Sequence, residues 1–131
     1  MSGPIPTRWV AQLDGQRADA DRRLTGADQH LGAGEGGRAL EEVYPGVMGA
    51  AMVRVWLKDE PWHTTRSFQD MSRMVREALP SGFATLFEMK HEHRSFTGWR
   101  AEDARPLVEE ARAFVNEVRA ELERCKASPP S

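Results

Sequence analysis

Residues 88–100 hold the densest group of side chains in this sequence that could take part in chemistry. The segment reads EMKHEHRSFTGWR and contains two of the four histidines, two arginines and a tryptophan. Histidine can move a proton near neutral pH, arginine can hold a phosphate through paired hydrogen bonds, and an indole ring can stack on a base. This segment is therefore the first candidate for a binding or catalytic site.

The His-Glu-His order within this segment suggests a metal site, but its spacing does not fit a helix. Two residues that are two positions apart on a helix point roughly 200° away from each other, so His91 and His93 cannot bind one ion together. Zinc ligands on a helix are usually three or four residues apart. The helical interpretation leaves His91 facing water and directs His93 and Arg94 toward the edge of the fold. We predict no metal and no cofactor.

Arginine and aromatic residues together could form a ligand-binding edge. An arginine beside an aromatic face suits a phosphate and a stacked base. Arg54 has a second interpretation, because an arginine beside an apolar stripe must pair with an acid or extend its stem to the surface. The residues predicted to edge the ligand-binding cleft are His63, His93, Arg94, Trp99 and Arg54.

Two other features could contact phosphate. Arg66, Arg73 and Arg76, together with Gln69, gather on one face of the helix expected after residue 65, and that face is either solvated or a phosphate contact. The glycine run GAGEGG at 32–37 is preceded by a helical pattern, and no Lys-Ser or Lys-Thr pair follows it. A phosphate-binding loop needs a strand before it, so a flexible turn between two helices is the preferred interpretation.

Apolar periodicity predicts helices along the whole chain. Residues 7–31 form an amphipathic helix, and residues 38–58 form a central buried helix that carries one charge, Arg54, between Val43 and Leu57. Shorter helices are expected at about 66–79 and 83–94, and the last helix opens at Glu102 or Asp103. The predicted fold class is an all-α bundle of about five helices, with a four-helix up-down core plus a short helix.

Three local features of this bundle can be predicted. Thr64 or Thr65 is expected to be the N-cap of the third helix. Phe96 and Trp99 are expected to fold back over the core from the loop before the last helix. Small residues on the central helix would let another helix approach closely, from the same chain or from a second copy. The core stripe of the third helix is predicted at Phe68, Met71, Val75 and Leu79, and the small residues are Gly46, Gly49, Ala50 and Ala51.

Composition limits the class of protein. The 131 residues suffice for one domain, predicted at 1–131 with disordered ends at 1–6 and 127–131. The formal charge of −2, from 18 basic and 20 acidic residues, argues against a protein that coats a polyanion. Cys125 stands alone, so a reducing compartment is expected. Since neither a signal peptide nor a membrane anchor is visible, we predict a cytoplasmic protein with no membrane contact.

The order of elements between residues 38 and 122 resembles that of the HEPN domains, the higher eukaryote and prokaryote nucleotide-binding family. The resemblance is closest to small stand-alone bacterial members. It depends on His63 in Trp62-His63-Thr64 before the third helix, on Arg94 followed by Gly98-Trp99, and on the pattern of the last helix at 109–118. It implies a dimeric helical bundle that is either an RNA-cleaving toxin or a partner of a small nucleotidyltransferase.

The ribonuclease motif of that family is absent from its usual place. The motif is an arginine and, after four to six residues, a histidine on the helix that 38–58 would supply, and this chain has no histidine between Leu31 and Trp62. Metal-free RNA cleavage needs a histidine to move a proton and an arginine to hold the phosphate. Only Arg23 and His30 have the spacing, with Gly26 between them, and they lie on a different helix.

Three functions follow as hypotheses. The preferred one is a HEPN-like homodimer without the ribonuclease motif, which binds a nucleotide, RNA or a protein partner such as a nucleotidyltransferase. The second is an active, metal-independent endoribonuclease of a toxin-antitoxin pair, using Arg23 with His30, or His63 with Arg94. The third is a structural interaction module, in which the glycine-alanine surface of the central helix forms a dimer or docks a partner.

Overall fold

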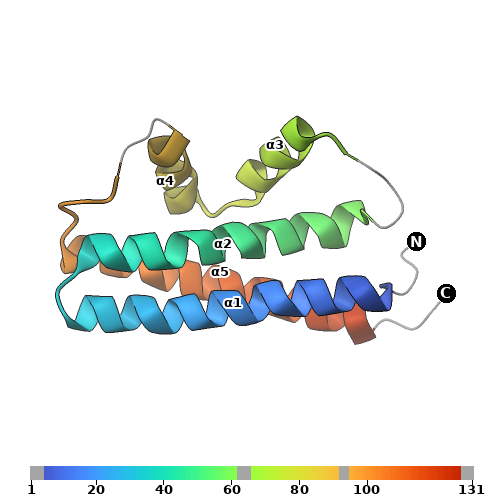
Figure 1. The fold of residues 1–131 in the computed structure, drawn as a ribbon, viewed down its shortest axis with the longest axis horizontal. Coiled ribbons are helices and arrows are strands. Elements are labelled where there is room, and N and C mark those ends of the chain that lie inside the picture. Colours follow the sequence, from blue (N-terminus) through green and yellow to red (C-terminus); the bar gives the residue numbers. More distant parts are fainter. Residues whose placement is uncertain (1–4, 62–65, 92–94, 128–131) are drawn as a thin grey trace.

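The computed structural model describes residues 5–61, 66–91 and 95–127, which form five α-helices and no strand. The prediction of an all-α helical bundle is confirmed (Figure 1). Ile5 packs against the core, and the last helix ends at Ala127. The helices are α1 (Thr7–Gly32), α2 (Gly36–Asp59), α3 (Phe68–Ala78), α4 (Ser81–His91) and α5 (Ala101–Ala127).

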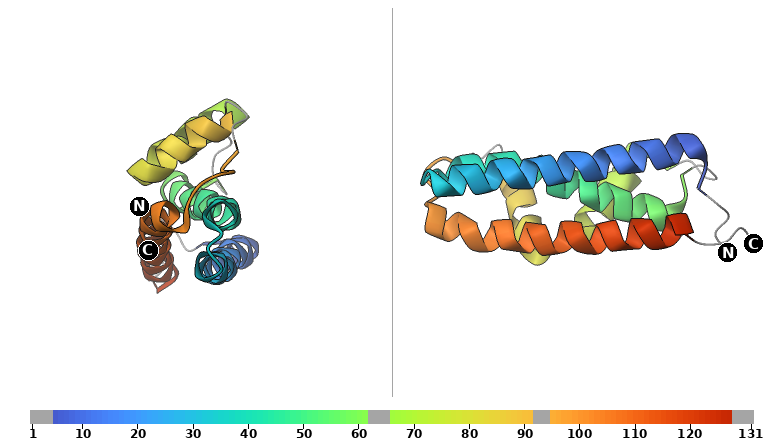
Figure 2. Two further views of the ribbon diagram at one scale, coloured as in Figure 1. Left: turned by 90° about the vertical axis from the view of Figure 1, so that its left-hand side faces the viewer. Right: turned by 90° about the horizontal axis from the view of Figure 1, so that it is seen from below.

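The helices form two unequal groups. α1, α2 and α5 have 26, 24 and 27 residues and lie side by side along the length of the molecule (Figures 1 and 2). α3 and α4 have 11 residues each and lie on the side of α2 that faces away from α1. The core is therefore made by three long helices, and two short helices cover one side of it.

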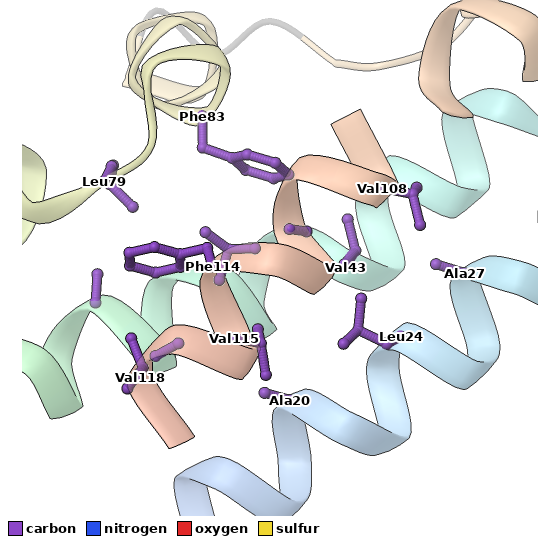
Figure 3. Packing of buried hydrophobic residues seen from close by; sticks show 14 of the residues in the cluster. Ala20, Leu24, Ala27, Val43, Leu79, Phe83, Val108, Phe114, Val115 and Val118 are labelled. Carbon is purple, nitrogen blue, oxygen red and sulfur yellow. The ribbon is translucent and has the colours of Figure 1, made fainter. Parts of the chain in front are cut away.

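The buried apolar stripes of the long helices meet between them (Figure 3). Leu24 of α1, Val43 of α2 and Val115 of α5 are almost inaccessible to solvent. Phe83 of α4 is fully buried and points toward α5, which brings α4 into the same cluster (Figure 3). Burying side chains of this size contributes about 1.5–3 kcal/mol each, so the long helices supply most of the stabilisation.

α2 is apolar on nearly every side because other helices cover it from two directions. α1 and α5 lie on one side, and α3 and α4 on the other. Gly46 and Gly49 face α1 closely: a Cβ at Gly46 would lie 3.3 Å from the Cα of Ala20, and one at Gly49 would lie 2.6 Å from Oε1 of Gln16. The small-residue surface is therefore used inside the chain and is not open to a second copy.

The glycine run forms the predicted turn between two helices, since α1 ends at Gly32 and α2 begins at Gly36. Its glycines also permit close packing. A Cβ at Gly36 would lie 2.4 Å from the carbonyl carbon of Arg100, and one at Gly37 would lie 2.4 Å from the carbonyl oxygen of Phe96. Phe96 is fully buried and Trp99 packs against the core, so the prediction that this loop folds back is confirmed.

The start of α3 differs from the prediction in two ways. Ser67 is the N-cap, with its hydroxyl accepting from the backbone N–H of Asp70 at 3.1 Å, whereas Thr64 and Thr65 lie outside the described residues. Phe68 was assigned to the core stripe, but 87% of its surface is exposed. The reason is that α3 is tilted, so its last turn packs against the core while its first turn stands away from α2 (Figure 1).

Candidate functional site

The tilt of α3 leaves an apolar groove between α2, α3 and α4. Its cavity has a volume of about 350 Å³. We call it the methionine groove, and its lining residues are Met48, Met52 and Trp56 of α2, Phe68, Met71, Ser72 and Val75 of α3, and Phe87 of α4.

Helical spacing explains how the sequence builds this groove. Met48, Met52 and Trp56 are four residues apart, so they follow one side of α2. Phe68, Met71 and Val75 of α3 are three and four residues apart, so they share one side of that helix and face the groove. α3 and α4 diverge from each other above α2, which leaves Met48 and Met52 only partly covered. Sequence periodicity therefore gives the stripes, and the angle between the short helices opens the space.

The chemistry of the groove favours apolar side chains. Ser72 provides the single hydroxyl among the lining residues, and every other side chain is a thioether, an aromatic ring or a valine. Methionine is unbranched and polarizable, so it adapts to the shape of whatever packs on it. Methionine-lined surfaces accordingly suit apolar segments of other protein chains.

The outer edge of the groove is polar and carries both signs of charge. A second cavity of about 330 Å³ shares Phe68, Ser72 and Phe87 with the groove and extends past the arginines of α3. Arg73 pairs with Asp70 at 3.3 Å, and Arg76 pairs with Glu88 of α4. An apolar centre with a mixed polar rim is the usual composition of a protein–protein interface.

α4 is a fixed wall of the groove because it is tied at both ends. At its start, the N–H of Gly82 donates to Oε1 of Glu110 on α5 at 2.9 Å. Near its end, Nζ of Lys90 lies 2.7 Å from Glu41 and 4.8 Å from the ring centroid of Phe96. Glu41 also accepts from the backbone N–H of Phe96 at 3.4 Å, which joins α4 to the loop before α5.

The predicted ligand-binding edge is not assembled by the described residues. His63, His93 and Arg94 lie outside them. Trp99 lies beside Gly36, at the start of α2, whereas Arg54 lies 18 residues further along the same helix. With a rise of about 1.5 Å per residue, this separates Arg54 and Trp99 by roughly 27 Å. The two side chains cannot edge one small cleft.

Arg54 pairs with acidic side chains, which was the second of its two predicted roles. Its guanidinium donates to both carboxylate oxygens of Glu121 on α5, at 3.2 and 2.5 Å, and to Glu117 at 3.4 Å. It also lies 4.9 Å from the ring centroid of Phe114. The hydrogen bonds to Glu121 raise the pKa of Arg54 above its already high value, so it stays charged and links α2 to α5.

Arg23 and His30, the predicted catalytic pair, have separate partners. Nε of Arg23 donates to Asp19 at 2.8 Å, and its Nη1 donates to the carbonyl oxygen of Glu42 at 3.4 Å. Nδ1 of His30 lies 3.0 Å from Oε1 of Glu35, and this hydrogen bond lowers the pKa of Glu35. The two side chains are seven residues apart, about 10 Å along α1, and each is occupied by its own carboxylate in this structure.

The predicted basic stripe is neutralised by carboxylates. Arg66 precedes α3 and is therefore not on the helix, and it pairs with Asp59 at 2.7 Å. Arg73 and Arg76 pair with Asp70 and Glu88, as described above. The rim of the groove therefore offers no excess of positive charge to a phosphate.

Sequence reasoning missed the groove, although part of its signal was present. Met48, Met52 and Trp56 repeat every four residues on a helix that is apolar all round, which indicates coverage from more than one side. The stripe on α3 was identified but assigned entirely to the core. Neither pattern reveals that α3 and α4 diverge.

Among residues 5–61, 66–91 and 95–127, no group of three or more His, Cys, Asp or Glu side chains could hold a metal ion. In the same ranges, no helix is both long enough and apolar enough to cross a membrane. Comparison of the chain with models of protein families, with curated proteins and with solved structures gives no match.

Proposed function

We propose that this protein is a HEPN-like interaction module that binds an apolar segment of a protein partner in the methionine groove. One observation carries the proposal: a groove of about 350 Å³ lined by methionine and aromatic side chains, with Phe68 87% exposed at its edge. A soluble monomer rarely leaves a contiguous apolar surface uncovered, so such a surface marks an interaction site.

A protein segment suits this groove better than a nucleotide does. Phosphate recognition needs cations that are free to donate, and the arginines on the rim are paired with Asp70 and Glu88. Diverting them would leave those carboxylates without their partners. The apolar side chains of a helix or loop, in contrast, would replace water against Met48, Met52 and Trp56. Burying this apolar surface lowers the free energy of the complex.

The resemblance to HEPN domains adds a nucleotidyltransferase and a second copy of the chain as partners for this groove.

Nucleotide or RNA binding stays a prediction centred on His63, His93, Arg94 and Trp99. A thermal shift with nucleotides or short RNA that Trp99→Ala abolishes would support it. The alternative of an active ribonuclease predicts growth arrest on expression of the wild type, relieved by His30→Ala or His63→Ala.

A peptide selection tests the groove directly. The bait is the whole chain, and the probe is a displayed library of peptides that can form amphipathic helices. Ser72→Arg places a charged side chain in the groove from an exposed position of α3, and arginine is a good helix former, so the fold should persist. Thr25→Arg makes the same addition at an exposed position of α1 and serves as the matched control.

The proposal predicts that selected peptides carry apolar anchors at helical spacing, bind the wild type and Thr25→Arg equally, and lose at least roughly tenfold in affinity for Ser72→Arg. Peptides that bind Ser72→Arg as well as the wild type, or a library that yields no binder, would remove the groove as the functional site.

A further inference from the structure

Phe68 is an exposed apolar side chain at the border of an apolar groove. It lines both the methionine groove and the adjacent cavity on the rim, yet 87% of its surface faces solvent. It is the one large apolar side chain among the described residues that is so exposed. The same face of the molecule therefore presents a protruding ring and a hollow next to each other.

A face with a protrusion beside a hollow is complementary to itself. In a twofold dimer the same patch is used on both subunits, so a residue of one copy meets the corresponding hollow of the other. A twofold axis beside Phe68 would place each ring over the partner's groove. The size also fits, because a dry cavity of about 150 Å³ accommodates a benzene-sized ring, and the groove measures about 350 Å³.

The charges on the rim also favour a second copy of the chain as the occupant of the groove. Two ion pairs lie at the outer edge of the groove, and their charges balance: Arg73 with Asp70, and Arg76 with Glu88. A partner with a strongly acidic or basic surface would meet like charges as well as opposite ones, which disfavours it. A second copy presents the same balanced set in the reverse order, so arginines can face carboxylates across the twofold axis.

We propose that a second copy of this chain occupies the methionine groove, with Phe68 of each copy inserted between the groove-lining methionines of the other. This inference rests on the proposed function, because it names the partner of the same groove. The two insertions are reciprocal, and each requires one intact ring and one open groove.

Sedimentation velocity over a range of protein concentrations tests the dimer with two variants. Phe68→Ala removes the ring and leaves the other lining residues of the groove in place, while Ser72→Arg blocks the groove and leaves the ring. Both positions are exposed, so both variants should fold, which circular dichroism verifies. The wild type and Thr25→Arg should dimerise alike, and each of the two groove variants should weaken the dimer at least roughly tenfold.

A mixture of the two variants gives the sharpest outcome. In the mixed dimer, Phe68 of the Ser72→Arg copy meets the open groove of the Phe68→Ala copy, so one of the two insertions is restored. The mixture should therefore associate more strongly than either variant alone. A wild type that stays monomeric, or a dimer that neither variant weakens, would overturn the inference.

The failure of this inference can be told apart from that of the proposed function. Phe68 itself lines the groove, so the peptide selection is repeated with the wild type and Ser72→Arg as baits, at concentrations at which sedimentation velocity shows monomers. Binders that compete at the groove while the wild type stays monomeric would leave the interaction module standing and replace the second copy by another protein. No binders and no dimer would remove both.

Discussion

The apolar side chains of the three long helices are covered by neighbouring helices, whereas part of the apolar stripe of α3 stays exposed. In the bundle of α1, α2 and α5, the apolar stripes close on one another, and ion pairs join the helices at their edges: Arg112 with Asp28 at 2.6 Å and Lys126 with Asp14 at 2.9 Å. α3 buries Val75 and leaves Phe68 exposed. Stability therefore resides in the bundle, and apolar surface that can bind a partner resides beside α3.

α3 and α4 also differ in how firmly each is attached to the long helices. α4 has Phe83 in the core, a cap from Glu110 on its first turn and the contact of Lys90 with Glu41 near its end. α3 is capped by its own Ser67 and packs mainly through its last turn. One wall of the groove is therefore fixed, and the other is held at one end, which would let the groove adjust to its occupant.

The largest expected contrast is between two phenylalanines, Phe83 in the core and Phe68 on the exposed side of α3. Phe83→Ala should lower the free energy of unfolding by about 3–5 kcal/mol, because it leaves a cavity in the core. Phe68→Ala should change it by less than about 0.5 kcal/mol in the monomer, because the side chain is exposed. Urea unfolding at low protein concentration measures both, and a large loss for Phe68→Ala would place that ring in the core.

A second contrast concerns two glycines. Gly36→Ala should cost about 1–3 kcal/mol, because the added Cβ would lie 2.4 Å from the backbone of Arg100 and backbone atoms cannot move aside easily. Gly15→Ala, in the middle of α1 with no neighbour within 4 Å, should instead stabilise the protein by about 0.5–1 kcal/mol. Equal effects in thermal unfolding would mean that the turn and the loop before α5 are not in contact.

The ion pair between α2 and α5 should matter more than the pairs on the rim of the groove. Arg54→Met should cost about 1–2 kcal/mol, since the side chain of Arg54 is 21% exposed and both oxygens of Glu121 lose a donor. Arg73→Met, at a side chain that is 65% exposed, should change stability by less than about 0.5 kcal/mol. Chemical denaturation of both variants tests the ranking, and a reversed order would contradict it.

The smallest expected effect is a dependence on pH at the edge of α1. The hydrogen bond from Arg23 lowers the pKa of Asp19 below its ordinary value of 3.8. A carboxylate with a lowered pKa stabilises the fold at pH values above the unfolded value, and this contribution is lost as pH falls through the folded pKa. The wild type should therefore lose more stability than Asp19→Asn below about pH 4. Identical acid unfolding profiles would show that the pair contributes nothing.

The sequence was sufficient for the bundle because its helices are long and strongly periodic. The turn at 32–37, the burial of Phe96 and the apolar surroundings of α2 all follow from local pattern and residue size. Periodicity also grouped Phe68 with Val75, but it reveals which residues share a face, not whether another element covers that face. The tilt of α3 decided that, and tilt depends on tertiary packing.

The predicted site fared differently because it depended on distances that a sequence does not contain. Arg54 and Trp99 suit the same ligand chemically, yet Arg54 lies in the second half of α2 and Trp99 lies in a loop beside the first residue of that helix. The partner of Arg54 is Glu121, 67 residues away, and no local pattern identifies such a pair. The groove combines residues from three helices, so it could be found only when their arrangement was known.

The methyl resonances of the methionines give the most direct test of the claim that the α3–α4 face binds a protein chain. The groove is lined by Met48, Met52 and Met71, whereas Met89 lies outside it. As the concentration of the wild type rises, or as a selected peptide is added, the three groove resonances should shift while that of Met89 stays nearly constant. If none of the three moves under either condition, or if Met89 alone responds, the methionine groove is not the binding surface.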